Sequence, residues 1–155
     1  MRRSVVENVS VVHIDEVSDA GVLRRGLERR LVGEITRDLD VRMSSPRALV
    51  DTLSGGNQQK VLFAKWLFRP PRVLIADEPT HGVDVGAKHA IYELITRLAA
   101  EGMGVLLISS ELEEVLGLAH RVLVMRGGAV IAEFDGHIAT EEAVMRAAFA
   151  AEAAA

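Results

Sequence analysis

The feature that most constrains the fold is a set of short apolar runs separated by segments of helical length. The runs "RVLIA" at 72–76, "VLLIS" at 105–109 and "RVLVM" at 121–125 are dominated by aliphatic residues. The first two runs are typical of strands buried on both faces of a parallel sheet. Between the first two runs, residues 86–100 carry apolar side chains on one side of a helix. This alternation predicts an α/β fold with a mainly parallel sheet.

The first 70 residues are expected to be mainly helical. A four-residue apolar rhythm predicts an amphipathic helix within residues 13–38. Its apolar positions are Leu23, Leu27, Leu31 and Ile35. Residues 40–52, with Pro46 and several Ser and Asp, are typical of a connector. A second helix is predicted from Ser54, which can cap it, to about Phe68, where two prolines follow.

The C-terminal part is predicted to close the sheet with a hairpin. A short helix is expected at 111–118, followed by "RVLVM" and "VIAEF". Gly127 and Gly128 separate these two runs, which is a hairpin signal. The alanine-rich stretch 140–151 is predicted to be helical.

Length and composition exclude several kinds of protein. A chain of 155 residues is long enough for one compact domain, and its net charge of −4 gives no reason to expect nucleic-acid binding. Without cysteine it cannot form disulfides or a thiolate metal site. Neither a signal-peptide core nor an apolar run of about 20 residues is present. We therefore expect any work at a membrane to depend on a partner.

The strongest local signal is "VLIADEPT" at residues 73–80. Asp77 and Glu78 follow a buried strand, and ligands of open α/β sheets bind at the carboxyl ends of strands. Adjacent residues point in alternate directions, so the two carboxylates can serve two roles. One can hold Mg²⁺, usually through water, and the other can orient and deprotonate an attacking water. The residues alone leave open which of the two carboxylates takes which role.

The second signal is "LSGGNQQK" at residues 53–60. Ser54, Gly55 and Gly56 precede a predicted helix, so main-chain N–H groups and the positive end of the helix dipole point outward together. The glycines allow the backbone to approach a phosphate, and the serine hydroxyl adds a hydrogen bond. This stretch lies about 20 residues before the paired carboxylates.

The two motifs together resemble the ATP-binding cassette (ABC) family, the nucleotide-binding subunits of ABC transporters. "LSGGNQQK" is similar to the cassette signature, "VLIADEPT" to the Walker B strand, and "HGVD" at 81–84 to the D-loop with Asp84 as its aspartate. "VLLISSELEEV" resembles the switch-region strand, and "HRVLVMRGGAVIAEF" the closing hairpin. The resemblance implies a partial P-loop NTPase fold: one nucleotide-binding domain over 1–155, with a helical lobe and signature helix over 1–70 and part of a RecA-like core over 71–155.

Finer details resemble the ATPases of carbohydrate importers of the ribose, galactose and xylose type, in the second of their two cassettes. These details are "LSGGNQQK", "DEPTHGVDVGAK" and "SSELEEVLGLAHRVLVM". The resemblance implies ATP and Mg²⁺ as cofactors, with Asp77 as the metal ligand and Glu78 as the catalytic residue. It also implies that Ser54, Gly55 and Gly56 close over the ATP of another cassette. The remaining residues implied at nucleotide sites are Gln58, Asp84 and Ser110. Implied partners are a second cassette, membrane permease subunits and, indirectly, a periplasmic or extracellular sugar-binding protein. The implied location is the cytoplasmic face of the plasma membrane.

Three departures from the family pattern limit what this chain can do. A phosphate loop requires G-x-x-x-x-G-K-[ST], and none of the 13 glycines is followed by lysine. The Q-loop is also missing, since Gln58 and Gln59 belong to the signature, and "SVVENVSV" resembles the start of a helical lobe. We therefore expect the chain to begin part-way into a cassette. Thirdly, Ser110 stands where the family's switch histidine is expected.

These observations predict an ATP-binding component, or a fragment of one, that contributes its signature and Walker B strand to ATP-driven carbohydrate import. The polypeptide alone is predicted to lack ATPase activity, because the phosphate cradle is absent. Two alternatives stay open at this point. The chain could be a non-transport ABC-type ATPase module, although "HGVD" and the short flanks argue against this. It could also be a truncated remnant without function.

Overall fold

The structure is a computed structural model that describes residues 3–149. The chain divides into two compact units. The first unit consists of Met1–Leu74 and Pro79–Val105, and the second of Ile75–Glu78 and Leu106–Ala155. Two strands, β3 and β4, contribute residues to both units.

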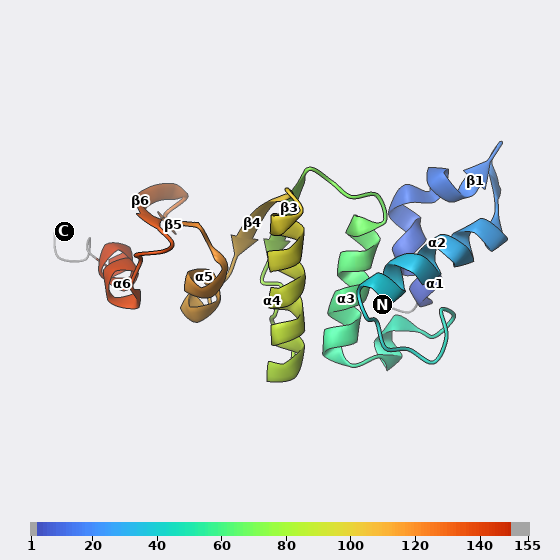
Figure 1. Cartoon of the computed structure of the whole chain (residues 1–155), viewed down its shortest axis with the longest axis horizontal. Helices are drawn as coiled ribbons and strands as arrows, with labels where there is room; N and C mark the ends of the chain where they lie inside the picture. Colours follow the sequence, from blue (N-terminus) through green and yellow to red (C-terminus); the bar gives the residue numbers. More distant parts are fainter. Residues whose placement is uncertain (1–2, 150–155) are drawn as a thin grey trace. The chain divides into compact units, whose positions relative to one another are not determined.

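Figure 1 labels most of the helices and strands along the chain. The elements that lie wholly in the first unit are α1 (Val5–Ser10), η1 (Val11–Val17), β1 (Ser18–Asp19), β2 (Val22–Leu23), α2 (Arg25–Asp38), η2 (Val50–Thr52), α3 (Gly55–Leu67) and α4 (Val85–Ala100). The shared strands are β3 (Val73–Asp77) and β4 (Gly104–Ile108). The second unit adds α5 (Leu112–Leu118), β5 (Arg121–Arg126), β6 (Ala129–Asp135) and α6 (Glu141–Phe149).

The N-terminal region differs from the predicted single helix. Only α2 is an α-helix within the predicted stretch 13–38, because the 3₁₀ helix η1 and a small β1–β2 hairpin occupy its first half. Ala20 and Gly21 have φ of 47° and 80°, a turn conformation that a helix cannot contain. The prediction was therefore wrong up to Leu23, which lies in β2.

Helix α1 begins with a capping box that the sequence analysis did not identify. The Ser4 hydroxyl accepts a hydrogen bond from the Glu7 N–H, and the Glu7 carboxylate accepts one from the Ser4 N–H at 2.9 Å. The Ser4 hydroxyl also donates to the Glu7 carboxylate at 2.7 Å, and this bond, followed by that from the Ser4 N–H, lowers the pKa of Glu7 below its ordinary value. The predicted connector 40–52 also helps to cap this helix. The carbonyls of Pro46 and Ala48 accept hydrogen bonds from the first N–H groups of α1.

Helices α3 and α4 pack closely at one glycine. Gly56 is buried in the first turn of α3, and a Cβ placed on it would overlap the Cβ of Ala87 in α4. The two helices can therefore approach at this point only because residue 56 has no side chain. The remaining core of α3 is apolar, with Val61, Ala64 and Leu67 buried.

Strands β3 and β4 pair in parallel across the α4 crossover. Near their starts the Gly104 N–H donates to the Arg72 carbonyl at 3.0 Å, and beyond β3 the Glu78 N–H donates to Ile108 at 2.8 Å. The start of β3 thus lies beside the start of β4, and the end of β3 lies beside the end of β4. The two strands therefore run in the same direction. This confirms the predicted parallel pair and places Asp77 at the carboxyl end of the sheet.

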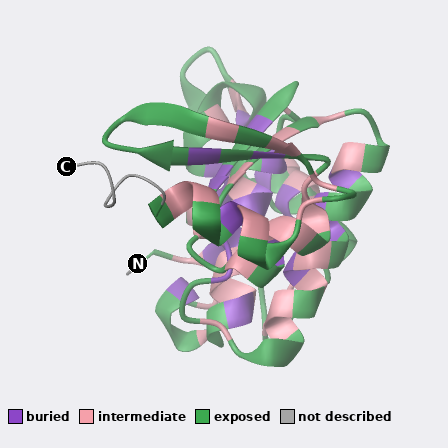
Figure 2. Ribbon diagram, turned by 90° about the vertical axis from the view of Figure 1, so that its left-hand side faces the viewer, coloured by how far each residue is buried: buried purple, intermediate pink, exposed green. Residues whose placement is uncertain are grey.

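The second unit forms its core between the β5–β6 hairpin and two helices. Val122 and Val124 of β5 and Val144 of α6 are buried together, with residues of α5 packed against them. The alternate residues of β5 are exposed, as the colours of Figure 2 indicate for the hairpin. The turn residues Gly127 and Gly128 both have positive φ, the conformation of a two-residue type I′ turn. The predicted hairpin is therefore confirmed.

The other predicted elements agree with the structure within one or two residues. Predicted helices at 54–68, 86–100 and 111–118 correspond to α3, α4 and α5. The predicted C-terminal helix corresponds to α6, and its last positions, 150 and 151, lie outside the described residues. Within residues 3–149, none of the helices combines the length and the apolar character that a membrane span requires.

The packing of α3 on α4 predicts the effect of one substitution. We expect Gly56→Ala to lower the free energy of unfolding by about 1–3 kcal/mol, because the added methyl group overpacks against Ala87. Adding Ala87→Gly should recover part of this loss, which a double-mutant cycle in urea would measure.

A matched control is Gly33→Ala in α2, where a Cβ would meet nothing within 4 Å. This change should raise the free energy of unfolding by about 0.5–1 kcal/mol. Equal stability of Gly56→Ala and the wild type would contradict the close approach at Gly56.

Candidate functional site

The first candidate element lies at the carboxyl end of β3, in the second unit. Asp77 is exposed, so its carboxylate is available to a hydrated cation. Glu78 follows directly, is half-buried, and has a φ of 46°. This left-handed conformation is uncommon for a residue with a long side chain. This conformation ends the strand geometry directly after Asp77.

Glu78 is held at two points by the segment that follows β4. Its N–H donates to the Ile108 carbonyl, and its Oε1 accepts a hydrogen bond from the Ser110 N–H at 2.8 Å. The structure thus brings together Glu78 and Ser110, two residues that the sequence predicts for the site. The contact uses the main chain of Ser110, whereas the prediction considered its side chain at a nucleotide site.

The second candidate element is the signature at the N-terminus of α3, in the first unit. Ser54 occupies the N-cap position but its hydroxyl makes no capping bond to the helix N–H groups, which corrects the predicted cap. The reason is Asn57, whose Nδ2 donates to Ser54 Oγ at 2.8 Å. Asn57 Oδ1 in turn accepts from the Arg42 N–H at 2.6 Å. Asn57 therefore orients the serine and leaves the hydroxyl proton available to another acceptor.

Asn57 belongs to the signature stretch, but the sequence analysis predicts no role for it. The contact between Asn57 and Ser54 could be predicted from the sequence, because an asparagine three residues after an N-cap serine lies within reach of that serine. Its bond to Arg42, 15 residues earlier, has no comparable local pattern.

The two glycines of the signature have different surroundings. Gly55 is exposed, and a Cβ placed on it would lie 3.1 Å from the Gly82 carbonyl oxygen. Gly56 is buried against Ala87, so its lack of a side chain serves helix packing. Gln58 is half-buried, and its Nε2 donates to the Leu53 carbonyl at 2.8 Å. The side-chain donor of Gln58 is therefore occupied within the loop that precedes α3.

Asp84, the predicted D-loop aspartate, lies at the N-terminus of α4. Its Oδ1 accepts a hydrogen bond from the Ala87 N–H at 3.0 Å, so Asp84 is the N-cap of that helix. The D-loop residue Gly82 has a φ of 74° and lies beside Gly55. The structure thus joins the signature and the D-loop within the first unit.

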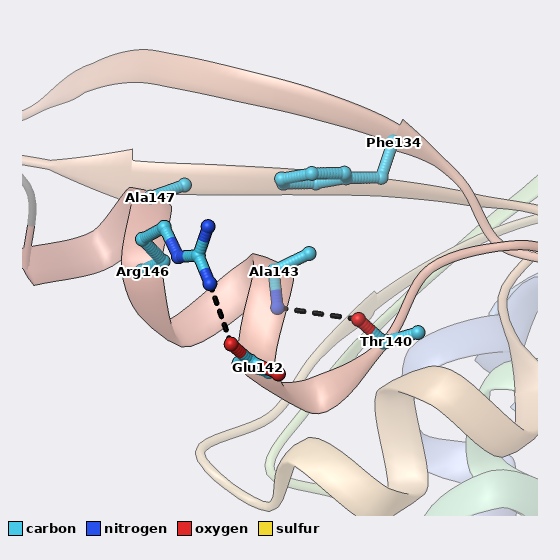
Figure 3. A pocket seen from close by; sticks show the side chains of 6 residues that line it. All are labelled: Phe134, Thr140, Glu142, Ala143, Arg146 and Ala147. Carbon is cyan, nitrogen blue, oxygen red and sulfur yellow. Dashed lines mark hydrogen bonds and ion pairs between the residues drawn. The ribbon is translucent and has the colours of Figure 1, made fainter.

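A cavity of about 470 Å³ lies elsewhere in the second unit, between β6 and α6. Figure 3 shows the Phe134 ring facing the helix and Arg146 paired with Glu142. None of the predicted site residues lines this cavity. Its charged side chains are paired with each other and lie at the surface, so the candidate site remains with the two motif elements.

Comparison with known proteins agrees with the motif resemblance. A family model described as "ABC transporter" matches residues 3–81, which is more than half of the 155-residue chain. This stretch contains the signature and the strand-end carboxylates.

Two curated relatives are ATP-binding proteins of sugar import. The chain is 51% identical over 145 residues to the ribose import ATP-binding protein RbsA 2 of Rubrobacter xylanophilus, covering 94% of this chain and 28% of the relative. It is 44% identical over 148 residues to the xylose import ATP-binding protein XylG of Geobacillus kaustophilus, covering 96% of this chain and 29% of the relative. The chain thus spans less than a third of the length of these relatives.

A solved structure supports the fold. The dimeric ATP-binding cassette MJ0796, in a post-hydrolysis state bound to ADP and Pi, matches with a TM-score of 0.72 at 23% identity. The match covers 86% of this chain and 56% of that chain, and at this identity it establishes the fold alone. The predicted fold class, a partial P-loop NTPase of the cassette type, is confirmed. The matching family model places this protein in the ABC transporter family.

Proposed function

We propose that this chain is part of the ATP-binding component of an ABC importer for sugars. Relatives at 44–51% identity are ribose and xylose import ATP-binding proteins. The observation that carries the proposal is the exposed signature at the start of α3, where Ser54 and Gly55 have no side-chain cap over the helix N–H groups. An uncapped helix N-terminus is suited to bind a phosphate.

The signature is suited to contact nucleotide held by another cassette. Gly55 is exposed beside the D-loop, and the Ser54 hydroxyl is oriented by Asn57. A hydroxyl donor, main-chain N–H groups and the positive end of a 13-residue helix converge there on one point. In this proposal Ser54, Gly55 and Gly56 donate to a phosphate, Gln58 fixes the loop behind them, and Asp84 holds the start of α4.

The strand-end carboxylates, Asp77 and Glu78, are suited to bind Mg²⁺ and to activate water for ATP hydrolysis. The exposed carboxylate of Asp77 would hold Mg²⁺ together with water and phosphate oxygens, the ligands that Mg²⁺ prefers. The ion would neutralise charge on the phosphates. Glu78 would accept a proton from, and orient, an attacking water. These roles require ATP at the end of β3, so a phosphate loop must come from a segment other than these 155 residues.

An apolar surface of the second unit supports the presence of such a segment. Ile75 of β3 is 64% exposed, and Leu106 and Ile108 of β4 are 47% and 46% exposed. Large aliphatic residues on one face of a sheet are normally covered by another layer. Each strand also pairs on one side only among the described residues. We propose that the phosphate-loop part of a cassette packs on this sheet.

The proposed partners are a second cassette, permease subunits and an extracytoplasmic sugar-binding protein that reaches the complex through the permease. The chain would then be peripheral at the cytoplasmic face of the membrane. The dimeric state of the similar cassette MJ0796 and the import function of the relatives support this assignment.

A replacement experiment tests the proposed function. The segment of the R. xylanophilus relative that aligns with this chain would be exchanged for residues of this chain, in cells that lack their own ribose ATPase. We expect ribose uptake to be retained. Ser54→Arg should lower uptake by about tenfold or more, because the side chain displaces the phosphate from the helix N-terminus.

Ser44→Arg is the matched control, since Ser44 is also exposed but lies outside the signature. It should leave uptake unchanged. Loss of uptake in the unmutated exchange, with normal expression, would argue against the proposed function.

The isolated 155-residue polypeptide should not hydrolyse ATP. Phosphate release with Mg²⁺ and ATP is expected to equal the buffer rate, because no phosphate loop holds the β- and γ-phosphates. Glu78→Gln should give the same background. Magnesium-dependent turnover that disappears in Glu78→Gln would overturn this prediction.

A further inference from the structure

The contact between Glu78 and the segment after β4 suggests how the candidate base is controlled. Two hydrogen bonds of 2.8 Å tie residue 78 to residues 108 and 110, one from its main chain and one to its carboxylate. Both lie within the second unit. A glutamate fixed at its N–H and at its Oε1 has little freedom to move apart from this segment.

The backbone of Glu78 supports the same interpretation. A φ of 46° places a residue with a Cβ in the left-handed region, which is unfavourable for side chains of this kind. Such a conformation persists where the surroundings determine it, and it is frequent at functional sites. Here the surroundings that can do so are the Ile108 carbonyl and the Ser110 N–H.

We propose that Ser110 is a positioning residue for Glu78 and acts through its main-chain N–H. This inference rests on the proposed role of Glu78 as the base. In this arrangement the Ser110 N–H holds Oε1 and leaves Oε2 as the oxygen that can accept a proton from water. Any displacement of residues 108–110 would move the carboxylate with them.

The proposal also gives a physical account of the residue type at position 110. The N–H that holds Glu78 is present in every residue except proline, so the contact does not require an imidazole. A serine at position 110 therefore keeps the hydrogen bond to the Glu78 carboxylate. On this basis Ser110→Ala and Ser110→His should both keep Glu78 in place.

Amide hydrogen exchange of the full 155-residue chain, followed by NMR, tests the contact directly. In Glu78→Ala the exchange of the Ser110 amide should accelerate by about tenfold, because a hydrogen bond to a charged group is lost. Glu78→Gln keeps an acceptor oxygen and should retain most of the protection. Ser110→Ala keeps the N–H and should match the wild type.

The amide of residue 78 is an internal control for folding. It donates to the Ile108 carbonyl and should stay protected in all variants, because that bond is between main-chain groups. Unchanged protection of the Ser110 amide in Glu78→Ala, with residue 78 still protected, would overturn the proposal.

A second measurement keeps the proposal testable if Glu78→Ala does not fold. In the wild type, the amide proton of Ser110 should resonate at lower field than in Glu78→Gln, because a hydrogen bond to a charged acceptor is stronger than one to a neutral acceptor. An identical Ser110 resonance in the two proteins would contradict the contact. Both readouts are independent of ATP, so failure of Glu78 as a base in an active complex would leave the outcome for Ser110 unaffected.

Discussion

The parallel pairing of β3 with β4 is the constraint on which the strand-end chemistry depends. The crossover through α4 returns the chain so that both strands end at the same edge. Glu78 then lies where the main chain of residues 108–110 can reach it. Without this pairing Glu78 would lose both of its hydrogen bonds, and its left-handed backbone would have no support.

The two candidate elements obtain their order from different contacts. At the signature, the geometry depends on the residue types. Asn57 orients Ser54 through its side chain, and the absence of a side chain at Gly56 lets α3 approach α4. At the end of β3, main-chain groups decide it, since Ile108 and Ser110 contribute a carbonyl and an N–H. Substitutions should therefore be tolerated better at position 110 than at positions 56 and 57.

Strands and helices with one dominant pattern were predictable from the sequence. The aliphatic runs of β3, β4 and β5 and the paired glycines of the hairpin each have a local cause. The prediction for 13–38 failed in its first half, because the four-residue rhythm begins only at Leu23 and the preceding Ala20 and Gly21 form a turn with positive φ. The turn therefore prevents a helix from extending through the whole stretch.

The candidate site was predictable by residue type but not by contact. Asp77 and Glu78 follow from their place after a buried strand, and Ser54 from its place before a helix. The bonds of Asn57 to Arg42 and of Ser110 to Glu78 join residues 15 and 32 positions apart. Such pairs depend on the tertiary fold, so no spacing rule within one element predicts them.

The central claim is that this chain contributes the signature half of an ATP site whose phosphate loop belongs to another cassette. Because the chain contains no cysteine, Ser54→Cys introduces a single thiol at that point. Its rate of modification by maleimide can be followed with Mg²⁺-ATP, with and without a cysteine-free cassette that carries a phosphate loop. The account predicts slower modification only when ATP and that cassette are both present. Equal protection by ATP alone, or none with both, would contradict it.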